Sequence, residues 1–220
     1  MKKILITLLY FLATLMMFAK NEGEPVIAVM ADGTRIEGFT TTRLINYLKP
    51  DVSTVSICRE PGGEEQQYTS DEVVELIFQP SEEDSTEVVY HAVKAQKQMP
   101  NAWNKNPKPY KKPVFLRLIY NGDNVKGYVR PAMDSSYTPS MTSVNYTWLY
   151  YYKLADQDIT KAYWFDTNDL IPSMRKVMKF YFREFPGLQK MVDNKELTPK
   201  EFRDNPSIVL PLMDAEAAGR

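Results

Sequence analysis

The segment from 146 to 185 constrains the fold of this chain more than any other. It opens with the aromatic run Tyr146-Thr147-Trp148-Leu149-Tyr150-Tyr151-Tyr152 and, after a polar reversal, continues with Ala162-Tyr163-Trp164-Phe165. Rings and branched side chains suit a half-buried pleated surface, so the two runs predict a β-hairpin. From Leu170 onward the spacing becomes helical, and one apolar face carries Met174, Val177, Met178, Tyr181, Phe182 and Phe185. We therefore expect an amphipathic helix to pack on an aromatic hairpin.

The two sides of the first predicted strand differ in ring area. Trp148, Tyr150 and Tyr152 lie on one side, and Leu149 and Tyr151 lie on the other, because side chains alternate along a strand. Burial of the larger ring area gains more free energy at ~25 cal/mol per Å². We therefore expect the helix to cover the Trp148 side, and Trp148 to contribute more to stability than Tyr151.

The N-terminal part of the chain has the pattern of a small barrel. Val26 to Phe39 alternates around Asp32-Gly33, a dipeptide typical of a tight type I′ hairpin turn. Further strands are predicted at Ser53 to Arg59, Gln66 to Thr69 and Val74 to Gln79. Five short strands within about 60 residues predict a barrel of the SH3 or Sm type.

The whole chain is therefore predicted to be mainly β, of the α+β class. Val114 to Arg130 forms a second hairpin around a turn at 121–124, and 131–144, rich in Ser, Thr and Pro, is predicted as a loop. The predicted organisation is a signal peptide at 1–19, the barrel at 20–80, a connector strand with a lysine- and proline-rich loop at 81–113, an antiparallel sheet covered on one face by C-terminal helices at 114–215, and a frayed tail at 216–220.

The first residues predict the compartment. Lys2 and Lys3 precede the apolar run from Ile4 to Phe18, and Ala19 is followed by polar residues, which is the pattern of a secretory signal peptide. A transmembrane anchor is the competing interpretation, but the run is shorter than the roughly 18 to 20 residues that span a bilayer. We expect an exported protein, periplasmic or secreted, that is soluble and has no membrane-spanning segment once the leader is removed.

Charge is distributed unevenly along the chain. Residues 20–86 carry 5 Lys/Arg against 14 Asp/Glu, whereas residues 87–220 carry 20 against 14. Such asymmetry is expected where two parts of a protein face each other, or where one part faces an anionic partner.

The sequence offers little support for catalysis. The only histidine is His91, in an apolar strand, and no Gly-x-Ser-x-Gly motif holds a nucleophile. The only cysteine, Cys58, leaves neither an internal disulfide nor a zinc cluster nor a redox pair. Solvated turns account for the acidic clusters Asp71-Glu72, Glu82-Glu83-Asp84 and Asp156 with Asp158. We predict no catalytic residue, no metal site and no cofactor, although a hydrolase that uses a carboxylate pair on an envelope or dietary polymer stays open as the alternative.

The segment from Lys94 to Pro113, called here the lysine loop, is the best candidate for function. It contains six lysines, four prolines and no acidic residue, so it is predicted to be an exposed irregular loop. Lysines attract anionic polymers, and an exposed ring can stack on a sugar or a base. The competing interpretation is that the loop packs on the acidic first part or is merely solvated. The predicted binding residues are Trp103, Tyr110, Lys105, Lys108, Lys111 and Lys112.

Several short patterns occur in an order that is informative when they are taken together. They are the Asp32-Gly33 hairpin, Tyr68-Thr69-Ser70, Ile77-Phe78, Val114-Phe115-Leu116, Leu149 to Tyr152, and Phe185 to Leu188. Together these patterns resemble a widespread family of uncharacterised exported proteins of Bacteroidetes-type bacteria. The resemblance implies a small β-barrel, a β-sheet and C-terminal helices, and it implies no activity. The function expected is that of an exported, non-catalytic binding or envelope-associated interaction protein, with an anionic or sugar-containing polymer or another envelope protein as partner and no nucleic acid.

Overall fold

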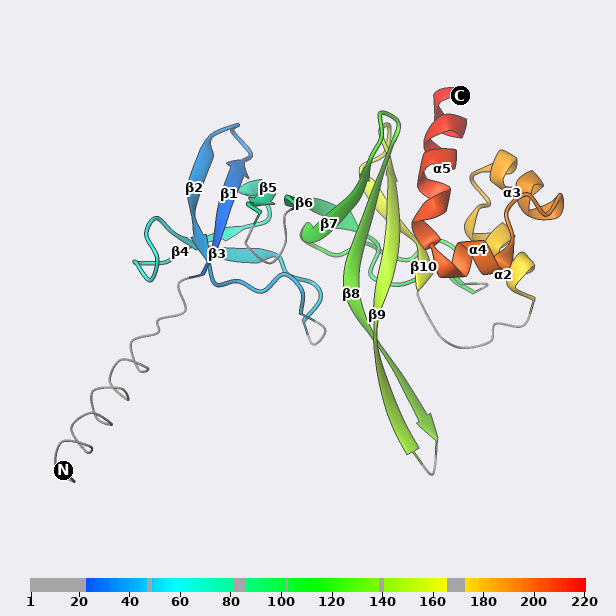
Figure 1. The fold of residues 1–220 in the computed structure, drawn as a ribbon, viewed down its shortest axis with the longest axis horizontal. Helices are drawn as coiled ribbons and strands as arrows, with labels where there is room; N and C mark the ends of the chain where they lie inside the picture. The colour runs from blue at the N-terminus through cyan, green and yellow to red at the C-terminus, as the bar shows by residue number, and fades with distance from the viewer. Residues whose placement is uncertain (1–22, 47–48, 81–85, 102, 139–140, 166–172) are drawn as a thin grey trace, which may run out of the picture.

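A computed structural model describes residues 23–46, 49–80, 86–101, 103–138, 141–165 and 173–220, without the side chains of 134–138 and 141–145. The predicted signal peptide at 1–19 and the acidic residues at 81–85 lie outside the described residues. The described chain is mainly β, with ten strands followed by short helices, so the predicted α+β class is confirmed (Figure 1).

The first five strands form an antiparallel set in the order β5-β1-β2-β3-β4. Their bounds are β1 Glu24–Met30, β2 Arg35–Thr40, β3 Thr54–Cys58, β4 Gln66–Thr69 and β5 Val73–Phe78. The predicted hairpin is present, but its turn is not of type I′, because Gly33 alone has a positive φ, of 86°. The carboxylate of Asp32 instead accepts a hydrogen bond from the Thr34 amide. Buried residues of β1, β3 and β5 fill one core with Val26, Ala28, Val55, Ile57, Val73 and Leu76.

The next five strands close into a barrel, called here the second barrel because it is the second strand set, where an antiparallel sheet was predicted. They are β6 Val88–Ala95, β7 Val114–Asn121, β8 Val125–Thr138, β9 Met141–Leu154 and β10 Ile159–Phe165. Each pairs antiparallel with the next, and β10 then pairs in parallel with β6 through Ile159↔Lys94 and Thr160↔Ala95. Since five consecutive antiparallel strands leave the first and last pointing the same way, the closing pair has to be parallel. Closure creates an interior that an open sheet would lack.

The two strand sets are joined through β5 and β6, which pair from Glu75↔His91 to Phe78↔Val88. Two loop contacts add to this link. The Phe115 amide donates to the Val52 carbonyl at 2.9 Å, and the Ser70 hydroxyl donates to the Pro113 carbonyl at 2.6 Å. In Figure 1 the first set lies on the left, and the second set lies between it and the helices.

The predicted loop at 131–144 is wrong, because β8 and β9 continue as one long hairpin. Their pairing runs from Val125↔Leu154 to Thr138↔Met141. Pairing of β8 with β7 ends at Val129, so Pro131 pairs with β9 alone and removes no bond to a second neighbour. Proline is tolerated at such an edge, which explains why a segment rich in proline and serine could still be a strand. Figure 1 shows this ribbon extending past the rest of the molecule.

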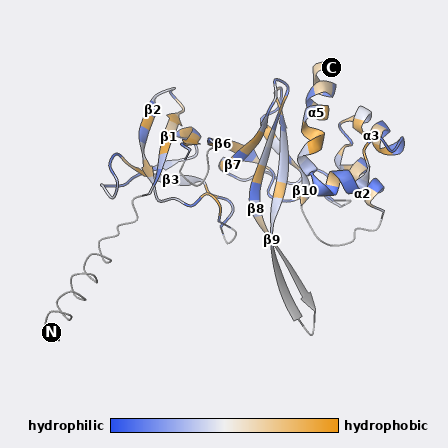
Figure 2. Ribbon diagram, viewed as in Figure 1, coloured by the Kyte–Doolittle hydropathy of each residue, from blue (hydrophilic) through white to orange (hydrophobic). Residues whose placement is uncertain are grey.

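The helices cover the outer face of the second barrel. They are α2 Met174–Tyr181, α3 Pro186–Asp193, α4 Pro199–Asp204, the 3-10 turn η1 Pro206–Ile208 and α5 Val209–Ala218. Hydrophobic and hydrophilic residues alternate around them in Figure 2, as expected of helices buried on one side. Within the described residues, no helix has the length and apolarity that a membrane span requires. The core between helices and barrel contains Tyr152, Tyr163, Trp164, Met178, Phe182, Phe185, Leu188, Phe202 and Leu210.

The aromatic strand is covered on both sides, which corrects the expected ranking of its rings. Tyr152 packs under the helices as predicted, with Tyr150 beside it. Trp148 is only half buried, whereas Tyr151 is completely buried. Tyr151 and Leu149 point into the closed interior of the second barrel, and the barrel wall covers them as fully as the helices cover Tyr152.

The last residues are not frayed, contrary to the prediction for 216–220. Helix α5 continues to Ala218, and the Glu216 carboxylate accepts hydrogen bonds from the amides of Gly187 and Leu188 at the start of α3. The guanidinium of Arg220 donates to the Glu184 carbonyl and lies 4.9 Å from the centre of the Phe185 ring. These polar contacts hold the end of the chain on the start of α3.

Asp214 of α5 fixes the turn between β7 and β8. Its Oδ1 accepts hydrogen bonds from the amides of Asn124 and Val125, both at 2.7 Å, and its Oδ2 accepts one from the Tyr120 hydroxyl at 3.2 Å. Partial burial alone would raise the pKa of Asp214, but these hydrogen bonds to the carboxylate hold it below its usual value of 3.8. A Cβ on Gly122 would meet this carboxylate at 2.6 Å, so glycine is needed there.

The Asp214→Asn variant is therefore expected to lose about 1 to 2 kcal/mol of unfolding free energy at neutral pH, since two amides lose a charged acceptor. Because the folded pKa of Asp214 is lowered, its stabilisation is present above pH 3.8 and is lost as the pH falls through the folded value. Urea midpoints of both proteins should differ at pH 7 and converge in acid. Asp204→Asn, at an exposed position of α4, is the control and should follow the wild type throughout.

Candidate functional site

The lysine loop is irregular, as predicted, but it is held in place at both its base and its middle. Gln96 and Pro109 form an isolated bridge, and the Tyr110 amide donates to the Ala95 carbonyl at 2.9 Å. Further out, the Arg183 guanidinium, just after α2, donates to the Lys105 carbonyl at 2.6 Å. A segment with four prolines thus acquires a fixed course through contacts with distant parts of the chain.

Trp103 is presented to solvent by a turn built on Asn101. The Asn101 side-chain oxygen accepts hydrogen bonds from the amides of Trp103, at 3.0 Å, and Asn104, at 2.8 Å. The Asn101 amide in turn donates to the Asn104 carbonyl at 2.9 Å. The Trp103 side chain is 98% exposed, the most exposed large hydrophobic residue among those described. An ordered turn that holds an indole in water is an unusual use of a residue that is mostly buried in proteins.

The four predicted lysines of the loop are all exposed. In the part of the chain that the structure describes, none of Lys105, Lys108, Lys111 and Lys112 forms an ion pair. Lys112 is the one with an acidic neighbour, because its charge adds to the hydrogen bonds from Thr69 that lower the pKa of Glu72. The loop therefore combines an exposed ring with four exposed cations that form no ion pair among the described residues.

Tyr110, the second predicted ring, is part of the support of the loop. It is half buried, and burial raises the pKa of its hydroxyl. Cationic groups already lie over its ring, with Lys97 Nζ at 5.6 Å and the Arg130 guanidinium at 6.0 Å from the ring centre. Trp103 and the four predicted lysines are thus exposed, whereas Tyr110 is half buried against Lys97 and Arg130, so the two rings do not form one exposed shelf.

Arg130 is a supporting residue that the sequence analysis missed. It is 7% exposed, and its Nε donates to the Tyr151 hydroxyl at 2.8 Å, while that hydroxyl donates to the Gln96 carbonyl at 3.3 Å. Burial would lower the pKa of Arg130, but its contacts with Tyr151 and Tyr110 raise it overall, so the guanidinium stays charged. The alternation of side chains along β8 could have predicted this role, because residues 128 and 130 lie on the same face of the strand and Tyr128 faces the interior of the second barrel.

The structure gives the surroundings of two of the groups weighed for catalysis, His91 and the pair Asp156 and Asp158. His91 lies 3.1 Å from the Tyr128 hydroxyl and 3.6 Å from a Glu75 carboxylate oxygen, and burial is the main cause that lowers its pKa. Asp156 and Asp158 are exposed in a turn. Among the described residues, no group of three or more His, Cys, Asp or Glu side chains is close enough to hold a metal ion. The cluster at 82–84 lies outside the described residues.

Comparison of the chain with protein-family models, with curated proteins and with solved structures finds no match. The fold and the loop define a mainly β protein whose second barrel, covered by helices, displays a basic loop with one exposed tryptophan.

Proposed function

We propose that this protein is an exported, non-catalytic binding or envelope-associated interaction protein that binds an anionic or sugar-containing polymer through the lysine loop. The observation that carries the proposal is the 98% exposure of Trp103, whose amide is bound by Asn101, in a loop whose exposed Lys105, Lys108, Lys111 and Lys112 form no ion pair among the described residues. Export is proposed from the basic and apolar start of the chain, and membership of the Bacteroidetes-type family from the patterns quoted above.

The two kinds of side chain in the loop have separate roles in this proposal. Exposed lysines draw in a polyanion at long range and make its binding depend on salt, because the screening length falls from about 10 Å at 0.1 M to about 3 Å at 1 M. The Trp103 ring supplies a flat apolar surface for a sugar ring, and this contact is much less sensitive to salt. Pre-ordering of the loop by Asn101 and Arg183 lowers the entropy lost on binding.

The test is a binding panel of acidic and neutral glycan polymers with purified full-length protein. Trp103→Ala is expected to weaken binding about tenfold, which corresponds to about 1.4 kcal/mol, without a change in melting temperature. The triple variant Lys105→Gln, Lys108→Gln, Lys111→Gln is expected to weaken binding at low salt and to flatten its salt dependence.

A second triple variant on the helices is the matched control. Lys190, Lys200 and Arg203 are exposed on α3 and α4, and their replacement by glutamine removes the same charge from another surface. If both triple variants weaken binding equally, net charge alone is responsible and the loop is not the site. The proposal is wrong if no polymer of the panel binds the wild type, or if every polymer that does so binds the Trp103→Ala variant equally well.

A further inference from the structure

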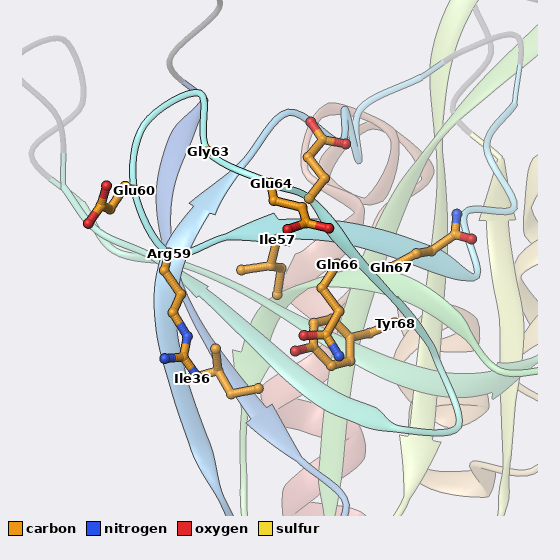
Figure 3. A pocket seen from close by; sticks show the side chains of 10 residues that line it. Ile36, Ile57, Arg59, Glu60, Gly63, Glu64, Gln66, Gln67 and Tyr68 are labelled. Atoms are coloured by element: carbon orange, nitrogen blue, oxygen red, sulfur yellow. The ribbon is translucent and has the colours of Figure 1, made fainter.

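The first strand set, β1 to β5, contains a hollow that the lysine loop does not line. It has a volume of about 640 Å³ and lies between β2, β3, β4 and the turn at 59–65, as Figure 3 shows. It opens because β2 and β3 pair only through Phe39↔Cys58 and Thr40↔Ile57, and then diverge. At Gly38 the strands are still so close that a Cβ would lie 2.4 Å from the Cys58 carbonyl oxygen.

The floor of the hollow is apolar. Ile57 is 3% exposed, and Ile36 and Tyr68 are half buried at its edge. All three belong to or pack against the core of the first strand set, so the hollow reaches that core from outside. An apolar side chain of a ligand would extend this core and be removed from water there.

One wall of the hollow is an unpaired strand edge. The Met30 amide donates to the Thr34 carbonyl, so alternation along β2 directs the amides and carbonyls of Ile36 and Gly38 toward β1. The amides and carbonyls of Arg35 and Glu37 then point away from β1, and β3 pairs with neither residue. Such an edge offers donors and acceptors in the spacing of a strand and is where an extended peptide adds to a sheet.

The rim of the hollow is acidic. Glu60, Glu64 and Glu65 lie around it with a single cation, Arg59. All four are exposed, and the Glu65 carboxylate accepts a hydrogen bond from the Thr41 hydroxyl at 2.8 Å, which fixes one side of the turn to the end of β2. The unpaired edge and the apolar floor favour a ligand that is an extended strand with apolar side chains. The acidic rim favours positively charged side chains at the other positions of that strand.

We propose that the hollow binds an extended, basic segment of a partner protein as an added strand on β2. The segment pairs with Arg35 and Glu37, places an apolar side chain on Ile36 and Ile57, and turns its lysines or arginines toward Glu60 and Glu64. This site is independent of the proposed polymer site, because it lies on the first strand set and carries the opposite charge. The lysine loop of a second copy fits less well, since that loop is bound to its own barrel at Gln96 and Pro109.

The probe is a synthetic peptide of about eight residues that alternates lysine with valine, titrated into the full-length protein. Binding is expected to protect the amides of Arg35 and Glu37 from hydrogen exchange, which a purely ionic contact would not do. A peptide of the same charge interrupted by proline, and one with glutamate in place of lysine, should not bind.

Variants at Glu37 separate strand pairing from charge. Glu37→Pro removes the outward amide donor and leaves the bonds to β1 intact, so it should weaken the peptide about tenfold while Glu37→Gln stays close to the wild type. Glu60→Gln with Glu64→Gln should weaken binding and flatten its salt dependence. Trp103→Ala should bind the peptide normally, whatever its effect on polymers.

Three results would overturn the proposal. The first is no binding of the alternating peptide, and the second is equal binding by the Glu37→Pro and Glu37→Gln variants. The third is self-association of the protein that ends when the lysines of the lysine loop are replaced, because the occupant of the hollow would then be a second copy of this chain.

Discussion

Raising the pH from about 9 to about 12 is expected to unfold this protein in one cooperative transition, because four buried tyrosines oppose ionisation in the folded state. Burial raises the pKa of Tyr128, Tyr151, Tyr152 and Tyr163 above the usual value of 10.0, and for Tyr151 to about 12. The folded pKa exceeds the unfolded one, so their stabilisation is complete below pH 10 and is lost as the pH rises toward the folded values.

The expected size of this effect is large. Each tyrosine contributes about 1.4 kcal/mol per pH unit between its two pKa values, and four together remove about 6 kcal/mol per unit. A typical stability of about 5 to 15 kcal/mol is then exhausted within about one to three units above pH 10. Circular dichroism and the tyrosinate absorbance should therefore change together during an alkaline titration.

Tyr163→Phe provides the check on this mechanism. Its hydroxyl donates to the Pro206 carbonyl at 3.1 Å, so the variant is expected to lose about 1 kcal/mol at neutral pH. Because one ionising group is gone, its stability should fall less steeply above pH 10. Tyrosinate that forms at these sites while the dichroism signal is unchanged would contradict the prediction.

Trp164→Ala is expected to lower the unfolding free energy by about 3 to 5 kcal/mol, because it empties the core between the second barrel and the helices. Trp164 is 1% exposed, and its ring centre lies 5.0 Å from that of Phe202 on α4 and 6.5 Å from that of Tyr181 on α2. The melting temperature should fall by about 6 to 20 °C, at about 2 to 4 °C per kcal/mol for a protein of this size.

Trp148→Ala, on the neighbouring strand, is the matched control, because this ring is only half buried. It should cost clearly less than Trp164→Ala in urea denaturation. Trp164→Phe should also lower the unfolding free energy only slightly. The Trp164 indole N–H has no hydrogen-bond partner in the part of the chain described, so its removal relieves the cost of burying an unpaired donor and offsets part of the packing energy that the smaller ring loses. Equal midpoints for the two alanine variants would contradict the burial that the fold assigns to these rings.

Local patterns predicted most of the elements. The alternation in Val26 to Phe39, in Val114 to Arg130 and in the aromatic runs has the period of a strand, and the structure has strands at each of these places. The capping box at the start of α4 is equally local, because its two hydrogen bonds join Thr198 and Glu201, which are three residues apart. Elements whose signal lies within a few residues were therefore predictable.

The errors concern contacts between distant residues. The presence of Pro131 favoured a loop at this place. The structure shows that Pro131 pairs with β9 on one side alone, and proline is tolerated in a strand at such an edge. Closure of the second barrel by β10 and β6, more than sixty positions apart, decided that Tyr151 is buried and Trp148 is not. Likewise, the hydrogen bonds of Glu216 with the start of α3 hold the C-terminal residues, which were expected to fray, in a helix.

For the candidate sites too, some properties were predictable from the sequence and others depend on the tertiary structure. The sequence by itself determined that the lysine loop is basic, irregular and rich in exposed groups, because four prolines and six lysines leave few other conformations. Only the tertiary structure decided that Trp103 faces solvent while Tyr110 lies beneath Arg130, and that β2 and β3 diverge to open the acidic hollow. The physical reason is that charge and backbone preference are properties of each residue, whereas burial and strand pairing depend on which distant segments meet.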